Sequence, residues 1–297
     1  MQRPWYLLIL LLASSPWLRA QSEEFSFDAE EFEPKAFEFT GYLEAEPEYG
    51  WANQDGALYQ LQFLDRDPQK HLERFTGTLE LEGRARKGIV GVHFQTHSEL
   101  VRDYLGDDDD HALYQGYVTL QPDPGFAVDL GKKAVRWGKG YAWNPVAFVE
   151  RAKDAGDPDL SREGYWVAAA DWIKSFDGPL QSLALTPLIL PVQNDVNEGF
   201  GEPGHNNLAA KLYLLYRDID IDLMFLSEGS RSARVGMDFS KNLAPNFEIH
   251  GEFAYFKDVI HLTLTDGCKK GTPRVQDEVS YLFGTRYRTS NDITLIW

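Results

Sequence analysis

The sequence predicts an all-β chain, an antiparallel transmembrane β-barrel of about 12–16 strands in the full protein. Apolar and polar residues alternate along many segments, and Gly, Asp, Asn or Pro separates one segment from the next. No comparable amphipathic helix interrupts the segments after the first twenty residues. A spanning strand shows lipid an apolar face and places polar groups in a wet lumen, which is the pattern expected here.

Composition supports a folded β protein and argues against a nucleic-acid partner. Of the 297 residues, 43% are hydrophobic and 13% are aromatic, more than a disordered chain carries. The chain has 46 acidic and 29 basic residues and a formal net charge of −17, whereas phosphate binding needs a basic surface. A single cysteine, Cys268, cannot form an internal disulfide, so the fold itself must stabilise the protein.

The first twenty residues predict a Sec signal peptide. Arg3 precedes an apolar run from Trp5 to Ala13, and Ala20 offers a small residue before the expected cleavage. The run is too short to cross a bilayer as a helix, and a buried N-terminal helix is the alternative. Residues 21–35 are acidic and are expected to form a periplasmic lead segment, followed by a barrel domain over residues 36–297.

Each strand is predicted by its own alternation. In residues 36–46, Phe37, Phe39 and Leu43 share one face, and Glu38 and Glu44 lie on the other. Further strands are predicted at residues 74–84, 88–99, 111–121, 125–138, 164–175, 179–190, 207–217, 218–227, 233–240, 246–257, 278–288 and 291–297. The strands number about thirteen, whereas bacterial single-chain barrels have an even number. Since the last segment is also short, we expect the chain to stop before the barrel closes.

Two segments show the membrane pattern most clearly. In residues 218–227, three aspartates alternate with Ile219, Ile221 and Leu223, and residues 246–257 repeat the pattern with glutamates. Rows of charge need water on their own side of a sheet. The predicted acidic row that lines the pore consists of Asp218, Asp220, Asp222, Glu248 and Glu252.

The alternation changes parity within residues 125–138. The apolar residues before and after the change are Phe126, Val128, Leu130, Val135 and Trp137. A one-residue β-bulge near residues 131–133 would return all of them to the lipid side and turn Arg136 inward. A bulge is therefore expected there.

A long connection follows this strand, at about residues 138–163. Connections of this length are usually functional or disordered, and we expect this one to fold inward and narrow a pore. The predicted basic patch lining the pore consists of Lys132, Lys133, Arg136, Lys139, Arg151 and Lys153. The alternative is that these cations pair with carboxylates of the lumen and hold the loop in place.

Residues 131–160, GKKAVRWGKGYAWNPVAFVERAKDAGDPDL, follow the strand-like QGYVTLQPDPGFAVDL. Together they resemble the part of porin-like Gram-negative outer-membrane β-barrels in which a strand ends in a Trp-Gly pair and an Asn-Pro-containing segment follows. Residues 32–49, FEPKAFEFTGYLEAEPEY, resemble the first strand of such barrels. The resemblance implies residence in the outer membrane after Sec export.

No motif indicates catalysis, a metal or a cofactor, and we expect none of the three. The aspartate run Asp107–Asp110 is interpreted as a solvated loop, and the spacing of residues 218–222 does not continue into an EF-hand loop. His93 and His97 lie four residues apart but in a strand, without the glutamate of a zinc-protease motif.

Three functions remain open at this stage. The first is a porin-like conduit for small, charged solutes, and the second is a structural or assembly-partner barrel that sheathes another exported protein. The third is a soluble periplasmic β enzyme such as a glycosidase. For a barrel, the expected partners are outer-membrane lipid, small solutes and the barrel-assembly machinery, with a homo-oligomer or an exported protein as further alternatives.

Overall fold

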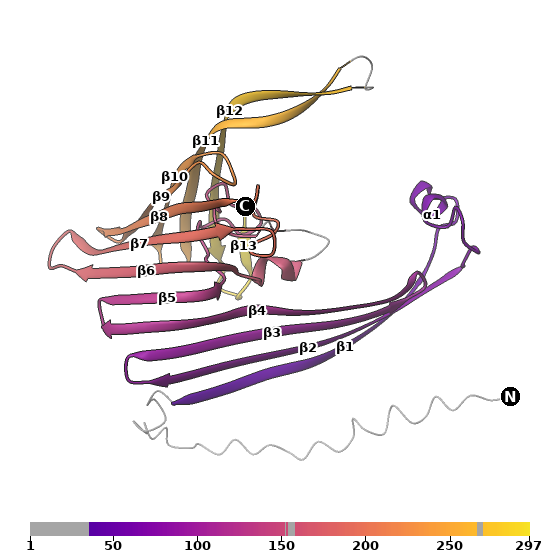
Figure 1. Cartoon of the computed structure of the whole chain (residues 1–297), viewed down its shortest axis with the longest axis horizontal. Coiled ribbons are helices and arrows are strands. Elements are labelled where there is room, and N and C mark those ends of the chain that lie inside the picture. Colours follow the sequence, from indigo (N-terminus) through magenta and orange to yellow (C-terminus); the bar gives the residue numbers. More distant parts are fainter. Residues whose placement is uncertain (1–35, 152, 154–157, 266–269) are drawn as a thin grey trace. The chain divides into compact units, whose positions relative to one another are not determined.

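A computed structural model describes residues 36–151, 153, 158–265 and 270–297 of the chain (Figure 1). The predicted signal peptide and acidic lead segment, residues 1–35, lie outside the described residues. The described residues belong to one compact unit, residues 36–297.

Thirteen strands form one sheet in chain order, and every neighbouring pair is antiparallel. The strands are β1 (Phe37–Trp51), β2 (His71–Lys87), β3 (Val90–Asp103), β4 (Gly106–Asp123), β5 (Phe126–Lys133), β6 (Tyr165–Ser175), β7 (Leu180–Val192), β8 (His205–Tyr216), β9 (Ile219–Leu226), β10 (Arg234–Ala244), β11 (Phe247–Thr265), β12 (Lys270–Arg288) and β13 (Thr294–Ile296). The prediction of an all-β antiparallel fold is confirmed. Alternation of period two was the signal that predicted it.

The sheet is not closed, since β1 and β13 form its two edges and do not pair with each other in the described part of the chain. Figure 1 shows it curling, so that β9–β12 turn away from the direction of β1–β5. Helical structure is limited to α1 (Ala57–Gln62) and the 3₁₀ turn η2 (Pro158–Arg162) within the described ranges. No helix among the described residues is both long and apolar enough to cross a membrane.

Because neighbouring strands run in opposite directions, their connections divide between two ends of the sheet. One end, here called the short-turn end, carries residues 88–89, 124–125, 176–179, 217–218, 245–246 and 289–293. The other, the long-loop end, carries the long connections 52–70, 193–204 and 227–233, the described part of 134–164 and one tight turn, 104–105. Short turns at one end and longer loops at the other are typical of outer-membrane-type barrels.

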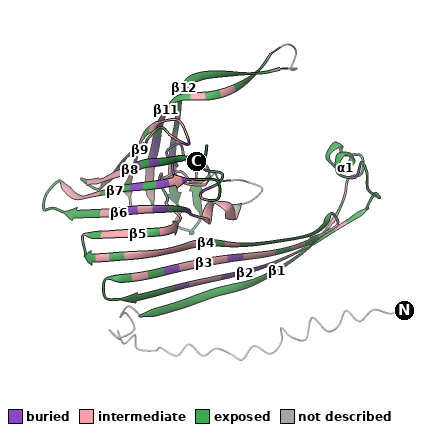
Figure 2. Ribbon diagram, in the orientation of Figure 1, coloured by how far each residue is buried: buried purple, intermediate pink, exposed green. Residues whose placement is uncertain are grey.

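The two faces of the sheet differ in burial, as β9 shows. Asp222, Met224 and Leu226 are 2%, 3% and 0% exposed, whereas Leu223 and Phe225, which alternate with them, are 43% and 45% exposed. We call the first the inner face and the second the outer face. Figure 2 shows that β1, in contrast, is exposed along nearly its whole length.

The strand predicted over residues 125–138 is too long, and the bulge predicted within it is wrong. β5 pairs with β4 up to Lys132 and with β6 up to Lys133, with no register shift near residues 131–133. The chain leaves the sheet after Lys133, and this departure explains the change of parity. Trp137 is therefore buried at 2% exposure instead of facing lipid, and Arg136 is exposed.

The aspartate run is part of a strand and not the loop that we expected. Asp107–Asp110 lie in β4 and pair with residues 99–102 of β3, and all four aspartates are exposed. Arg102 lies opposite Asp107, with 3.7 Å between Nε and Oδ2. A strand tolerates adjacent acids here because both faces of this part of the hairpin meet solvent.

Candidate functional site

The described part of residues 134–164, namely 134–151, 153 and 158–164, is called the inserted segment, and it covers the inner face of β6–β11. Its side chains Trp137, Val146 and Phe148 are at most 2% exposed and belong to one apolar cluster with strand residues. The strand residues of the cluster are Tyr165, Val167, Ala169, Leu188, Leu190, Val192, Ala209, Met224, Leu226 and Ala254. The hydrophobic effect thus holds the segment on the sheet.

Glu252 of β11 binds the backbone of the inserted segment. Its Oε1 accepts hydrogen bonds from the backbone N–H groups of Lys139 and Gly140, both at 2.6 Å. Its Oε2 accepts a third from Val146 N–H at 3.3 Å. Gly138, with a φ of 98°, permits this approach, since a Cβ there would lie 2.9 Å from Glu252 Oε1. Hydrogen bonds to a charged group contribute about 1.5–3 kcal/mol each.

Lys139 reaches a second acidic group on the inner face. Its Nζ lies 3.1 Å from Asp222 Oδ2 on β9 and 3.9 Å from Asp238 Oδ1 on β10. Lys211 of β8 contributes a further cation, 3.8 Å from Asp222 Oδ1. Burial acts to lower the pKa of Lys139, but the two aspartates outweigh it and the pKa is raised. Lys139 therefore stays charged and holds the segment to β9 and β10.

The last residues of β5 and residues within the segment also carry ion pairs. Lys132 and Arg151 both contact Glu163, the latter with 3.0 Å between Nε and Oε2. Lys133 pairs with Asp129 on the same strand. These contacts fit the alternative in which the cations of the predicted basic patch hold the loop.

The two remaining cations of the predicted patch are exposed and, among the described residues, form no ion pair. Arg136 faces solvent. Lys153 donates to the backbone carbonyls of Gly140 and Tyr141 at 3.2 and 3.0 Å and to Asn144 Oδ1 at 3.0 Å. Lys153 thereby closes the turn that carries Trp143.

The predicted acidic row is divided by the structure. Asp220 and Asp222 lie on the inner face with Glu248 and Glu252, and Asp220 accepts a hydrogen bond of 2.5 Å from a tyrosine hydroxyl of β8. Asp218 does not belong to the row: it lies in the exposed turn 217–218 with a φ of 60°. Because both turn residues have a left-handed φ, the alternation of β9 does not extend to Asp218.

The inner face of β2–β4 is polar, in contrast to the part of the inner face that carries the apolar cluster. Glu80 accepts hydrogen bonds from Gln95 Nε2 at 2.9 Å and from Arg162 NH2 at 2.5 Å, and Arg162 belongs to the end of the inserted segment. His97 stacks on Tyr114 with 4.6 Å between ring centroids. Within the described ranges, no group of His, Cys, Asp and Glu side chains is arranged to hold a metal ion.

A cavity of about 290 Å³ lies at the long-loop end, between the inserted segment and the 227–233 connection. We call it the arginine cavity, and its lining residues are Ala142, Trp143, Asn144, Ala147, Glu150, Arg151, Lys153, Arg231 and Arg234. Sequence reasoning missed Arg231 and Arg234. The sequence shows that they lie three residues apart at the start of a strand. Only the fold brings them next to Trp143, Glu150 and Lys153.

Two cationic side chains of the cavity, Arg231 and Arg234, are held by uncharged groups. Arg231 donates from Nε to Phe200 O and from NH1 to Phe148 O, the latter at 3.3 Å, and its guanidinium lies 4.1 Å from the ring centroid of Phe200. Burial lowers the pKa of Arg231. Arg234 lies over Phe256 at 5.0 Å. The guanidinium groups are thus fixed in position without a carboxylate partner among the described residues.

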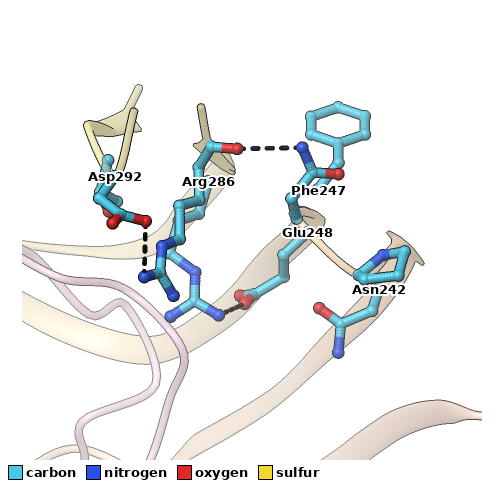
Figure 3. Close-up of a pocket in the computed structure, with 9 residues that line it drawn as sticks. Asn242, Phe247, Glu248, Arg286 and Asp292 are labelled. Atoms are coloured by element: carbon cyan, nitrogen blue, oxygen red, sulfur yellow. Dashed lines mark hydrogen bonds and ion pairs between the residues drawn. The ribbon is translucent and has the colours of Figure 1, made fainter. Parts of the chain in front are cut away.

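A second cavity, of about 390 Å³, lies at the short-turn end (Figure 3). Its two arginines are neutralised within the chain. Arg286 NH2 lies 2.6 Å from Glu248 Oε2, and Arg288 NH2 lies 2.9 Å from Asp292 Oδ1. This cavity therefore offers little free charge to a solute.

No family model matches the chain, and no curated protein matches it in sequence. Among solved structures, it is similar to Salmonella typhi OmpF in complex with daunomycin, at 11% identity and a TM-score of 0.47, over 86% of this chain and 75% of that chain. It is also similar to Pseudomonas aeruginosa OccK2, at 12% identity and a TM-score of 0.43, over 84% of this chain and 60% of that chain. The Acinetobacter baumannii outer membrane protein Omp33 aligns at 11% identity and a TM-score of 0.33, over 73% and 88% of the two chains. No residue role is carried over at these scores.

Proposed function

We propose that the chain forms the wall of an outer-membrane β-barrel and acts as a porin-like conduit for small, charged solutes. One observation carries the proposal: a single antiparallel sheet of 13 strands has an apolar, exposed outer face, and its charged networks lie on the inner face. Trp166, Leu208 and Phe225 on the outer face are 44%, 53% and 45% exposed. A continuous apolar surface of this kind marks a contact with lipid.

The inner face supports a conduit that is narrowed on one side. The inserted segment fills the space over β6–β11, while β2–β4 present Glu80, Glu82 and other polar side chains. Solutes would pass between the segment and this polar wall. In the membrane, the free edges of β1 and β13 must be hydrogen-bonded, because unpaired backbone groups are costly in lipid.

Export by the Sec pathway and insertion by the barrel-assembly machinery are part of this proposal, with outer-membrane lipid as the surrounding partner. A barrel that sheathes another exported protein is the second candidate. It is favoured by the apolar cluster, because a packed inner face reduces the space left for solute flow.

Conductance of the purified full-length protein in planar bilayers separates the two candidates. A conduit is expected to give discrete single-channel steps whose size follows salt concentration. Folding is checked independently, by a change of gel mobility on heating. Correctly folded protein that inserts but gives no conductance steps would contradict the conduit and favour the sheathing barrel.

A further inference from the structure

We propose that the arginine cavity binds a small dianionic solute that carries carboxylate or phosphate groups. The inference deepens the proposed function, on which any role in transport rests, by naming the class of solute. The binding itself does not depend on conductance.

At the arginine cavity, three cations have no ion-pair partner among the described residues. Among the described residues, no carboxylate lies within ion-pair distance of Arg231, Arg234 or Lys153. Glu278 attracts Arg234 only from beyond that distance. In a chain with a net charge of −17, three such cations at one cavity are unusual, since acids are abundant. A buried charge without a partner is costly, and an anion would offset that cost.

The other two charged side chains at the cavity, Arg151 and Glu150, already have partners. Arg151 is paired with Glu163 at 3.0 Å and lies over Tyr165. Glu150, the one acidic residue among the lining residues, accepts a hydrogen bond from the backbone N–H of Trp137. No ion pair joins Glu150 to a cation within the described residues, although Lys153 acts on it from a longer distance. The charge available to a solute comes from Arg231, Arg234 and Lys153, less the share of Lys153 that Glu150 offsets. Two negative charges on the solute would balance most of it.

The geometry of the two guanidinium groups suits an oxyanion. Guanidinium groups present planar forks that match the two oxygens of a carboxylate or phosphate. Contacts with Phe148, Phe200 and Phe256 hold both arginines in place, so little side-chain entropy remains to be lost on binding. Trp143, which is 55% exposed, offers an apolar surface to the body of the solute.

The arginine cavity is small and differs in charge from the cavity at the short-turn end. A volume of about 290 Å³ lies at the small end of ligand pockets, which selects a small solute. The cavity in Figure 3 is larger and also contains two arginines, but both are paired with acids. The difference is therefore one of charge and not of the number of arginines.

The test is isothermal titration calorimetry of the full-length protein in detergent at low salt, with inorganic phosphate and with succinate as probes. We expect at least one probe to bind, and the double variant R231Q/R234Q to weaken that binding by roughly tenfold or more. The matched control is R286Q/R288Q, which removes the same charge from the cavity of Figure 3 and should leave affinity nearly unchanged. Binding of phosphate alone or succinate alone supports the site and identifies the anionic group.

Two results would overturn the inference. One is that neither probe binds the folded wild-type protein at concentrations up to about 10 mM. The other is that R231Q/R234Q, with gel mobility showing that it is folded, keeps the wild-type affinity. Conductance without binding would contradict only this inference, whereas binding without conductance would contradict only the conduit.

Discussion

At the residue scale, single side chains decide whether the inserted segment stays on the sheet. Glu252 binds a backbone N–H that lies 113 residues away in sequence, and Lys139 reaches Asp222 on β9. Each contact places a charge in a poorly hydrated site, where losing one partner costs more than the pair contributes. Substitutions at these residues should therefore release the inserted segment under conditions in which the sheet is still folded.

Gly138 gives the first test of this anchoring. Gly138→Ala should destabilise the protein by about 1–3 kcal/mol from its φ of 98° alone, and by more because the new Cβ would crowd Glu252. The control is Gly178→Ala, where φ is 125° but no atom lies within 4 Å of the added Cβ. Urea titration in lipid vesicles measures the free energy of unfolding of both variants. Equal losses would show that the approach of Glu252 to the segment does not matter.

Glu150 gives a pH-dependent test. Burial raises its pKa to about 7, against an ordinary value of 4.5. The folded state holds the proton of Glu150 more tightly than the unfolded state does. The stability that protonation of Glu150 contributes is therefore present below about pH 4.5 and is lost as the pH rises through 7. Glu150→Gln should remove this dependence and stabilise the protein at pH 8 by about 3 kcal/mol at most.

Urea titrations at pH 5 and pH 8 check this prediction, with Glu198→Gln, an exposed change of the same type, as the control. A wild-type difference between the two pH values that survives in Glu150→Gln would contradict it. The groups that act on Glu150 besides burial are the Trp137 N–H, Lys153, Arg136 and Glu252.

At the element scale, the alternating aspartates of residues 218–222 belong to two different elements, the turn 217–218 and strand β9. The aspartates of residues 218–222 look equivalent, but the chain reverses at Arg217 and Asp218, both with left-handed φ. Asp222 is 2% exposed under the inserted segment, whereas Asp218 accepts only an exposed hydrogen bond from Gln181. The position in the strand, and not the residue type, decides the role.

The two aspartates can be compared directly. Asp222→Asn should lower the free energy of unfolding by about 3–5 kcal/mol, because it leaves Lys139 without its nearest buried partner. Asp218→Asn should change it by less than about 0.5 kcal/mol. Urea titration and limited proteolysis of the inserted segment measure the two effects. Similar losses of unfolding free energy in both variants would indicate that Asp218 and Asp222 belong to one acidic row, as the sequence predicts.

At the scale of the whole molecule, the sheet separates two environments. The outer face exposes apolar side chains along many strands, and the inner face holds the inserted segment and the charged networks. Charge is tolerated where water or a partner reaches it and is costly where lipid does. This separation is the property on which the proposed membrane location depends.

Leu223→Arg tests the separation, because Leu223 lies on the outer face of β9 and is 43% exposed. If this face contacts lipid, the variant should fold into vesicles with a loss of about 2–4 kcal/mol. Leu64→Arg, at a residue that is 75% exposed in the 52–70 connection, is the control and should fold normally. Equal folding of both variants would contradict a lipid-facing sheet.

The sequence by itself determined the all-β class and most of the strands, because alternation along a strand is a local property. Phe37 and Phe39 fall on one face of β1 for the same reason that Leu223 and Phe225 fall on one face of β9. The short turns between strands were equally visible, since Gly, Asn and Asp favour them.

Only the tertiary structure decided what the chain does after β5. From the sequence, Trp137 was expected on the lipid side, but it is buried because the chain leaves the sheet after Lys133. The tertiary structure also brings Lys139 to Asp222 and Arg231 to the inserted segment. Both contacts join residues that are far apart in sequence. Local patterns determine which face of the sheet a side chain points to. The partner of a charged side chain depends instead on which strands and loops the folded sheet brings together.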